Sequence, residues 1–152
     1  MNNTAVILLV EDNRMDVELT LDAFRERKLG NPVHTVPNGQ AALDYLFGAG
    51  EYADRTRYPI PDLILLDLKM SVVDGLTVLK RIKESQRLKR IPVIVLTSSS
   101  EEGDLALSYD SGANSYLVKP VSYDGFLEVV GKIEDYWLTL NVPPPPAGAT
   151  KA

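Results

Sequence analysis

The chain of 152 residues has the length of one domain, and its formal net charge of −5 argues against a protein that coats nucleic acid or an anionic membrane. It contains no cysteine, which excludes disulfides, thiolate catalysis and cysteine-ligated zinc, and its single histidine, His34, excludes a two-histidine metal site. The longest apolar run, residues 5–10, is far shorter than the ~18 residues that cross a bilayer, and no secretory signal is visible, so we expect a cytoplasmic protein.

Five short apolar segments recur along the chain as predicted strands. Residues 5–10, 63–66 and 92–96 are continuous apolar runs, which are typical of strands buried on both faces of a parallel sheet. Residues 33–36 and 114–118 mix polar and apolar side chains, which favours edge strands. The sequence therefore predicts three central strands and two edge strands.

A helical pattern follows each predicted strand. Apolar residues with a helical period predict helices over residues 14–28, 39–47, 75–84, 101–111 and 123–138. Asn13, Asn38 and Asp74 precede the first three helices as candidate N-caps, whose side chains accept hydrogen bonds from the first turn. Gly30 and Gly112 are the expected stops of the first and fourth helices.

This alternation predicts an α/β fold with a doubly wound, five-stranded parallel sheet of flavodoxin-like order 2-1-3-4-5 and five helices. In that order the functional crevice lies at the carboxyl ends of strands 1 and 3. Residues 1–140 form the expected domain. Residues 48–61 make an unusually long connection, and residues 141–152, which include four consecutive prolines, are expected to form a disordered tail.

Acidic side chains follow the first and third predicted strands. Glu11 and Asp12 occupy the position at which a phosphate-binding fold carries a glycine-rich loop, and Asp67 ends the third strand. Carboxylates at one crevice repel each other unless a cation lies between them, and Mg²⁺ suits such oxygen ligands. The alternative is structural, because acids at a helix N-terminus favour its dipole and Asp67 alone can cap a strand.

The fourth and fifth strands add a hydroxyl and an ammonium to the same rim, from Thr97 and Lys119. Taken singly, Thr97 is interpreted as a turn residue and Lys119 as a solvated charge, although Pro120 fixes the chain where that lysine points. Together with the carboxylates they suit transfer of a phosphoryl group onto an aspartate. In that reaction Asp67 attacks in line, while a cation and Lys119 neutralise the phosphoryl oxygens.

Five short motifs resemble, in order and spacing, the receiver domains of two-component response regulators. They cover roughly residues 5–138 and are Val10-Glu11-Asp12, Asp67-Leu68-Lys69-Met70, Asp74-Gly75, Leu96-Thr97-Ser98 and Tyr116-Leu117-Val118-Lys119-Pro120. The resemblance implies that Asp67 is the phosphoacceptor. It also implies that Asp12, Asp67 and the backbone carbonyl of Lys69 ligate Mg²⁺, and that Glu11 holds the ion through water.

The same resemblance implies roles in phosphoryl binding and switching. Lys119 would pair with the phosphoryl group and, with Asp67, would be catalytic in the chain's own magnesium-dependent phosphorylation and dephosphorylation. Thr97 would bond the phosphoryl group after activation, and Tyr116 would be the aromatic switch.

Two positions depart from the family pattern. Ser71 stands where the family usually has proline, and Ser98 where it usually has alanine or glycine, so we expect a more mobile loop and slower entry of the donor. A narrower resemblance is carried by residues 50–52, 88–92 and 133–137. It is to the stand-alone regulators that are partnered with bacterial phytochromes.

These features predict a single-domain response regulator that accepts a phosphoryl group from a sensor histidine kinase of phytochrome type and then switches its interaction surface. It is not expected to turn over a substrate. One alternative is an aspartyl-phosphate phosphohydrolase of haloacid dehalogenase type, which needs a second aspartate where Lys69 stands. Another is a flavin or nucleotide carrier, which the acidic first loop disfavours.

The basic residues between 80 and 90 are interpreted as a solvated helix face, so neither nucleic acid nor a membrane is an expected partner.

The last predicted helix has more apolar surface than packing on one sheet requires. At about 100° per residue, its sheet-facing residues are Phe126, Val130, Ile133 and Trp137. Apolar residues flank that sector on both shoulders: Val129, Tyr136 and Leu140 on one, Leu127 and Leu138 on the other. The excess predicts a homodimer through this helix, and the alternative is that the tail from Pro143 folds back over it.

Overall fold

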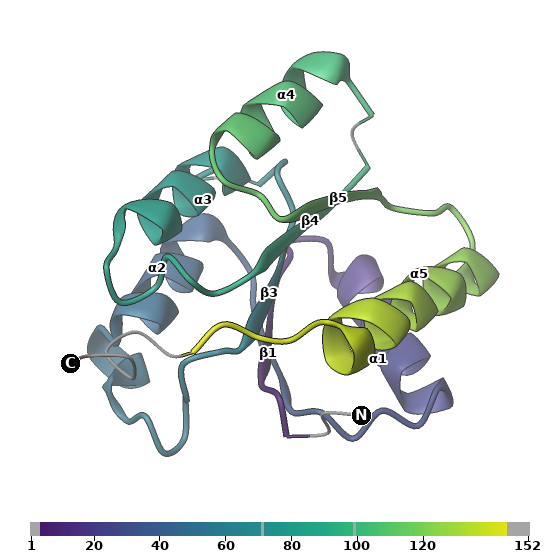
Figure 1. Ribbon diagram of the computed structural model, residues 1–152, viewed down its shortest axis with the longest axis horizontal. Coiled ribbons are helices and arrows are strands. Elements are labelled where there is room, and N and C mark those ends of the chain that lie inside the picture. Colours follow the sequence, from purple (N-terminus) through teal and green to yellow (C-terminus); the bar gives the residue numbers. More distant parts are fainter. Residues whose placement is uncertain (1–3, 71, 99, 146–152) are drawn as a thin grey trace.

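The computed structural model describes residues 4–70, 72–98 and 100–145, and its centre is a five-stranded parallel sheet (Figure 1). The strands are β1 (Ile7–Val10), β2 (Val33–Val36), β3 (Leu63–Leu66), β4 (Val93–Thr97) and β5 (Ser115–Val118). Their order is β2-β1-β3-β4-β5, which confirms the predicted order. The two strands of mixed polarity lie at the edges, as predicted.

Helices cover both faces of the sheet (Figure 1). They are α1 (Arg14–Glu26), α2 (Gly39–Phe47), α3 (Gly75–Glu84), α4 (Glu102–Asp110) and α5 (Tyr123–Asp135), with a 3₁₀ turn η1 (Gly50–Ala53) and a π-helical turn η2 (Tyr136–Leu140). Helices α1 and α5 pack side by side on one face, while α2, α3 and α4 lie on the other. Within the described ranges, no helix is long and apolar enough to cross a bilayer.

Alternate residues of the central strands enter two hydrophobic clusters, one on each face of the sheet. Leu8 and Ile64 belong to the cluster that includes α2 and α3, whereas Ile7 and Leu65 belong to the cluster that includes α1 and α5. All four side chains are fully buried, and burial of each contributes about 1.5–3 kcal/mol to stability. This packing explains the continuous apolar runs, because neither set of alternate residues meets water.

The first three helices begin at the predicted caps. The side chains of Asn13, Asn38 and Asp74 each accept a hydrogen bond from the backbone N–H three residues later, at 3.1, 2.7 and 2.9 Å. Each bond satisfies a donor that the first turn of a helix leaves without an intrahelical acceptor. These three caps therefore fix where the chain turns from the carboxyl edge of the sheet into α1, α2 and α3.

Helix α1 ends earlier than its sequence pattern predicts. It stops at Glu26 because Lys28 takes the left-handed conformation, with φ of 58°, and the N–H of Leu29 bonds the carbonyl of Phe24 at 3.0 Å. This Schellman-type ending buries Leu29 in the cluster that contains Phe24. The prediction that this helix runs to residue 28 and is stopped by Gly30 is therefore wrong.

The C-terminal helix changes its winding at Tyr136. The α-helix ends at Asp135 and a π-helical turn follows, so the 100° spacing used in the sequence analysis fails beyond that point. Leu138, predicted on a shoulder of the helix, is buried in the core instead. Tyr136 and Leu140 remain 50% and 72% exposed, so an apolar shoulder persists on one side only.

After η2 the chain crosses the amino-terminal edge of the sheet (Figure 1). Pro143 lines a cavity there together with Asp62 and Pro92, and the Arg90 guanidinium donates to the carbonyl of Pro145 at 3.4 Å. Leu140 lines the same cavity but stays largely exposed, as does Tyr136, so the described part of the tail does not cover either side chain. The rest of the predicted tail, residues 146–152, lies outside the described residues.

Tyrosine rings hold the long 48–61 connection against α2. The ring centroids of Tyr45, Tyr52 and Tyr58 lie 5.0–5.9 Å apart. The Arg55 guanidinium donates to the backbone carbonyls of Tyr45, Leu46 and Tyr58. The connection is therefore packed onto α2 and its own turn, away from the carboxyl ends of the strands.

Candidate functional site at the carboxyl ends of the strands

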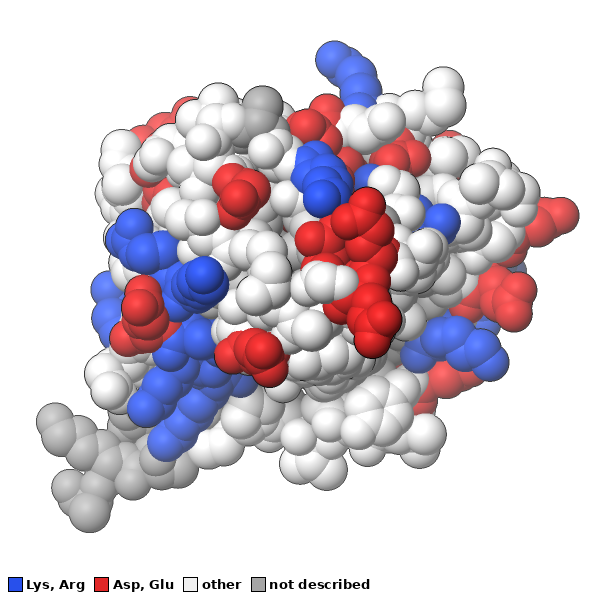
Figure 2. Space-filling model, turned by 90° about the horizontal axis from the view of Figure 1, so that it is seen from above, with Lys and Arg blue, Asp and Glu red and all other residues white. Residues whose placement is uncertain are grey.

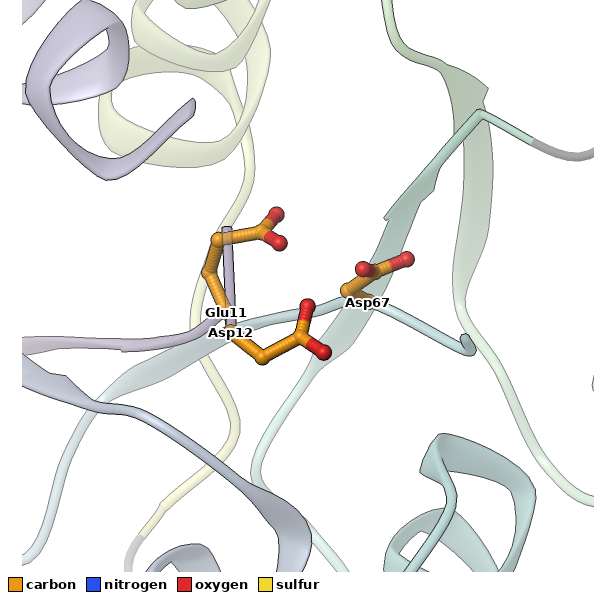
Figure 3. Close-up of side chains that lie close together, drawn as sticks. All are labelled: Glu11, Asp12 and Asp67. Carbon is orange, nitrogen blue, oxygen red and sulfur yellow. The ribbon is translucent and has the colours of Figure 1, made fainter. Parts of the chain in front are cut away.

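Three carboxylates meet where β1 and β3 end. The strands are in register, with Val10 opposite Leu66, so the residues that follow them emerge side by side. One carboxylate oxygen from each of Glu11, Asp12 and Asp67 lies within 4.8 Å of the other two (Figure 3). Glu11 and Asp67 are buried, whereas Asp12 is exposed. The structure thus brings together the three acids that the sequence analysis expected at one crevice.

Lys119 enters this group from the end of β5. Its backbone N–H donates to the carbonyl of Thr97 at 2.7 Å, which extends the β4–β5 pairing by one residue. Its Nζ lies 2.6 Å from Glu11 Oε1, 2.8 Å from Asp16 Oδ2 and 3.4 Å from Asp67 Oδ2. With a side chain only 7% exposed, Lys119 is a buried counterion rather than a solvated charge.

Burial and hydrogen bonding shift two pKa values in this group. Burial of Lys119 favours the neutral amine, but its hydrogen bonds to Asp16 and Glu11 outweigh burial and raise the pKa of Lys119. Burial raises the pKa of Glu11 to about 7; the hydrogen bond from Lys119 opposes this shift and the charge of Asp67 adds to it. Lys119 therefore remains an ammonium that compensates the surrounding carboxylates.

Asp16 is a member of this group that the sequence analysis did not single out. It lies in the first turn of α1, four residues after Asp12, and one of its carboxylate oxygens contacts Lys119. The predicted helix start carried a usable signal, because it puts Asp16 in the first turn of a helix that begins at the rim where Asp12 lies. Only the position of Lys119, however, distinguishes Asp16 from an ordinary acid near a helix N-terminus.

Thr97 and Tyr116 lie on the side of the site formed by β4 and β5. Thr97 is the last residue of β4 and is fully buried. Tyr116 is half-buried and packs against the cluster on the α2 and α3 face. Ser98 follows Thr97 and is exposed, while Ser71, the other departure from the family pattern, lies outside the described residues.

Lys69 points away from the carboxylate cluster and toward α4. Its Nζ lies 3.1 Å from Asp104 Oδ2, and this hydrogen bond raises the pKa of Lys69. Its backbone N–H lies 3.4 Å from Asp67 Oδ1. The side chain of Lys69 therefore lies outside the carboxylate cluster and only its backbone N–H contacts Asp67. The role of its backbone carbonyl as a metal ligand stays a prediction.

The face that carries the strand ends has a group of acidic side chains near its middle, and further acidic side chains lie among basic ones toward its edges (Figure 2). Figure 2, which looks onto this side of the molecule, shows Asp and Glu side chains gathered near the middle and most Lys and Arg side chains at the margins. A concentration of negative charge at a crevice attracts cations. The arrangement therefore suits a site that binds a cation and brings a phosphoryl group to a carboxylate.

Comparison with known proteins identifies the family. Residues 7–131 match the family model of the response regulator receiver domain. The chain belongs to this family. Receiver domains are signalling modules, which decides between the predicted regulator and the phosphohydrolase and flavin-carrier alternatives.

Two curated relatives match this receiver domain over nearly its whole length. The "Probable methanogenesis regulatory protein FilR2" of Methanothrix harundinacea is 42% identical over 142 residues, which cover 93% of this chain and 89% of that protein. The response regulator Rcp1 of Synechocystis sp. is 39% identical over 143 residues, covering 93% of this chain and 95% of Rcp1.

Solved structures similar to this receiver domain include three response regulators, of which RcpA is named for a phytochrome and RtBRR for a bacteriophytochrome. The phosphorylated cyanobacterial phytochrome response regulator RcpA is 40% identical with a TM-score of 0.87, and the Mn²⁺-bound form of Rcp1 is 38% identical with a TM-score of 0.84. Both comparisons cover 93% of this chain and 99% of the other. The bacteriophytochrome response regulator RtBRR is 45% identical with a TM-score of 0.74, covering 95% of this chain and 86% of RtBRR.

Proposed function

We propose that this receiver domain accepts a phosphoryl group on Asp67 from a sensor histidine kinase of phytochrome type and signals by a changed interaction surface. The observation that carries the proposal is the meeting of Glu11, Asp12, Asp67 and Lys119 at the ends of three strands. The partner is inferred from the similarity to RcpA, named as a phytochrome response regulator, and to RtBRR, named as a bacteriophytochrome response regulator.

The chemistry of this step uses groups that the chain itself supplies. A carboxylate oxygen of Asp67 attacks the phosphorus of a phosphohistidine, an O–P bond forms, and the N–P bond breaks with its electron pair left on the imidazole. Lys119, 3.4 Å from Asp67, is positioned to bond an oxygen of the incoming group. Because phosphoryl transfer depends mainly on positioning and charge compensation, an ammonium fixed at this distance is a useful partner.

The cluster also fits a divalent cation, for which we propose Mg²⁺. Its ligands would be Asp12, Asp67 and the backbone carbonyl of Lys69, with Glu11 acting through water. Carboxylate and carbonyl oxygens are the donors that Mg²⁺ prefers, and the bound ion would compensate charge on the phosphoryl oxygens. The Mn²⁺-bound form of Rcp1 supports a divalent ion in a related protein.

For the switch we propose Thr97 and Tyr116. The buried hydroxyl of Thr97 would bond the phosphoryl group on Asp67, and half-buried Tyr116 would respond by changing its packing beside α4. A swing between two states from 1:99 to 99:1 needs about 5.5 kcal/mol of differential binding energy, so several new bonds must contribute. The surface that changes would be formed by α4, β5 and α5.

We further propose that the protein is cytoplasmic, with residues 1–140 forming the receiver domain and residues 141–152 a tail. We also propose that it forms a homodimer through the region of α5. The exposed side chains of Tyr136 and Leu140 support an interface there, because large exposed apolar groups commonly mark contact sites. Binding of nucleic acid or of a membrane does not enter this proposal.

The test of this function is labelling of two aspartate variants. With a small acyl-phosphate donor and Mg²⁺, the wild-type protein and Asp110→Asn, which changes an exposed aspartate of α4, should be labelled equally, and Asp67→Asn should not. Wild-type labelling of Asp67→Asn would overturn the phosphoacceptor assignment. A second arm replaces the acyl phosphate by a phytochrome-type kinase and labelled ATP. If the acyl phosphate labels the protein but the kinase does not, Asp67 remains the phosphoacceptor and the phytochrome-type partner is rejected.

A further inference from the structure

The Lys119 ammonium contacts three carboxylates, and its contact with Asp16 is shorter than its contact with Asp67. Nζ lies 2.8 Å from Asp16 Oδ2 but 3.4 Å from Asp67 Oδ2, and Glu11 Oε1 is the third contact at 2.6 Å. An ammonium has three N–H donors, so these three carboxylates can occupy all of them. The direction of each N–H is thereby fixed by its partner.

The backbone around Asp16 holds its carboxylate in place. The N–H of Asp16 donates to the Asn13 side chain at 3.1 Å, and its carbonyl accepts from the hydroxyl of the buried Thr20 at 2.7 Å. The helix that carries these residues packs directly against α5. Asp16 is thus a fixed acceptor on a rigid element, although its side chain keeps 22% exposure.

Asp16 differs from the other two partners of Lys119 in what else it does. Glu11 and Asp67 belong to the cluster of three acids whose oxygens lie within 4.8 Å of each other, and the proposed function commits them to a cation and a phosphoryl group. Asp16 is not a member of that cluster. Its charge therefore stays available to Lys119 when the other two carboxylates change partners.

We propose that Asp16 is a positioning residue for phosphoryl transfer, which anchors the Lys119 ammonium so that one N–H points at the oxygen of Asp67. The inference rests on the proposed function and adds a residue to it. Asp16 acts through Lys119 and does not touch the reacting atoms itself. A group that is oriented in advance accelerates transfer because it does not have to be ordered during the reaction.

The decisive experiment is a double-mutant cycle on Asp16 and Lys119. Rates of labelling by an acyl phosphate at saturating Mg²⁺ are compared for wild type, Asp16→Ala, Lys119→Ala and the double variant. Asp16→Ala should slow labelling about tenfold in the wild-type background and by less than about twofold when Lys119 is absent, a coupling of the size found for contacting residues. Asp16→Asn, which keeps an acceptor oxygen, should recover part of the rate.

Controls separate positioning from other roles. Glu18→Ala removes an exposed acid of the same helix and should leave the rate unchanged, and Mg²⁺ affinity should be the same in Asp16→Ala as in wild type. The four proteins of the cycle are also unfolded in urea, where the contact must appear as non-additive stability even if Lys119→Ala is labelled too slowly to follow.

The outcomes that overturn the inference differ from those that overturn the function. An equal loss of rate with and without Lys119, or additive stabilities, would show that Asp16 acts only on helix α1. An unchanged rate in Asp16→Ala would show that Lys119 needs no anchor. In each case Asp67→Asn tests the phosphoacceptor separately, because its labelling does not depend on what Asp16 does.

Discussion

The carbonyl oxygen of Asp67 occupies the space that a side chain on Gly75 would need. A Cβ on Gly75 would lie 2.2 Å from this oxygen and 2.6 Å from Cα of Leu68. The N–H of Gly75 in turn donates to the carbonyl of Leu68 at 3.0 Å. Helix α3 therefore begins in direct contact with the backbone that carries Asp67, and only glycine permits this approach.

We predict that Gly75→Ala destabilises the protein by about 2 kcal/mol, since backbone must move to relieve an overlap of this size. It should also slow labelling of Asp67, because that movement displaces the nucleophile. Urea unfolding and the acyl-phosphate assay measure the two effects. Gly103→Ala is the matched control, as Gly103 lies in the first turn of α4 and has no atom within 4 Å of its would-be Cβ. Equal stability of the two variants would show that the close approach is not required.

The acidic cluster should respond unequally to loss of its members. We predict that Asp12→Ala weakens Mg²⁺ binding strongly and Glu11→Ala less, because only Asp12 is proposed to ligate directly. A Mg²⁺ titration of each variant measures the difference. Glu128→Ala, an exposed acid on α5, is the control and should bind as wild type does. Equal affinities for all four proteins would reduce the cluster to a set of acids that favour a helix N-terminus.

Removing the ammonium should separate metal binding from phosphorylation. Lys119→Ala is expected to retain Mg²⁺ binding, because the substitution removes a positive charge that repels the ion. The variant should nevertheless be labelled slowly. Once labelled, it should bind its partner no differently from the unlabelled protein. The comparison protein is Lys132→Ala, which removes an exposed lysine of α5. Normal labelling and switching by Lys119→Ala would remove this lysine from the site.

A second partly buried lysine has a structural role. Lys83 Nζ lies 3.1 Å from the carbonyl of Lys89, 2.9 Å from that of Ile91 and 3.3 Å from Asn114 Oδ1, and burial lowers the pKa of Lys83. Lys83→Met should therefore lower the free energy of unfolding by about 1–3 kcal/mol, because three acceptors lose their donor. Lys80→Met, at an exposed position of the same helix, should change it little. Similar urea midpoints for both variants would contradict this role.

The exposed shoulder near the C-terminus predicts self-association. Sedimentation at tens of micromolar, with and without a phosphoryl mimic, should show a dimer. Leu140→Ser should shift it toward monomer, while Val121→Ser, which changes an exposed residue before α5, should not. A monomer under both conditions would end the dimer proposal. A dimer only with the mimic would make dimerisation the output of the switch.

The features predicted well from the sequence are those fixed by local patterns and by strand order. Buried and mixed-polarity runs placed β1 and β3 at the centre of the sheet, and this alone brings Asp67 next to Glu11. The features that escaped prediction depend on contacts distant in sequence. The role of Asp16 depends on its contact with Lys119, which follows β5 and is distant in the sequence. Likewise, the contact of Lys69 with Asp104 depends on where α4 packs.

The sequence pattern also did not predict two places where the backbone departs from regular α-helical geometry. The left-handed Lys28 ends α1 because Leu29 gains a place in the core, and the π turn at Tyr136 rotates Leu138 inward. In both places burial of a leucine outweighs the regular continuation of the helix.

The hydrogen bond between Lys119 and Asp16 joins residues 103 positions apart. During synthesis the first strand and helix leave the ribosome long before Lys119 does, so Glu11 and Asp16 stay without their counterion until β5 has joined the sheet. Since β5 is an edge strand that pairs only with β4, it joins a sheet whose other four strands have already been synthesised. A nascent or truncated chain that lacks β5 thus contains the proposed phosphoacceptor Asp67 without the ammonium, and under the proposed function we expect it to be labelled as slowly as Lys119→Ala.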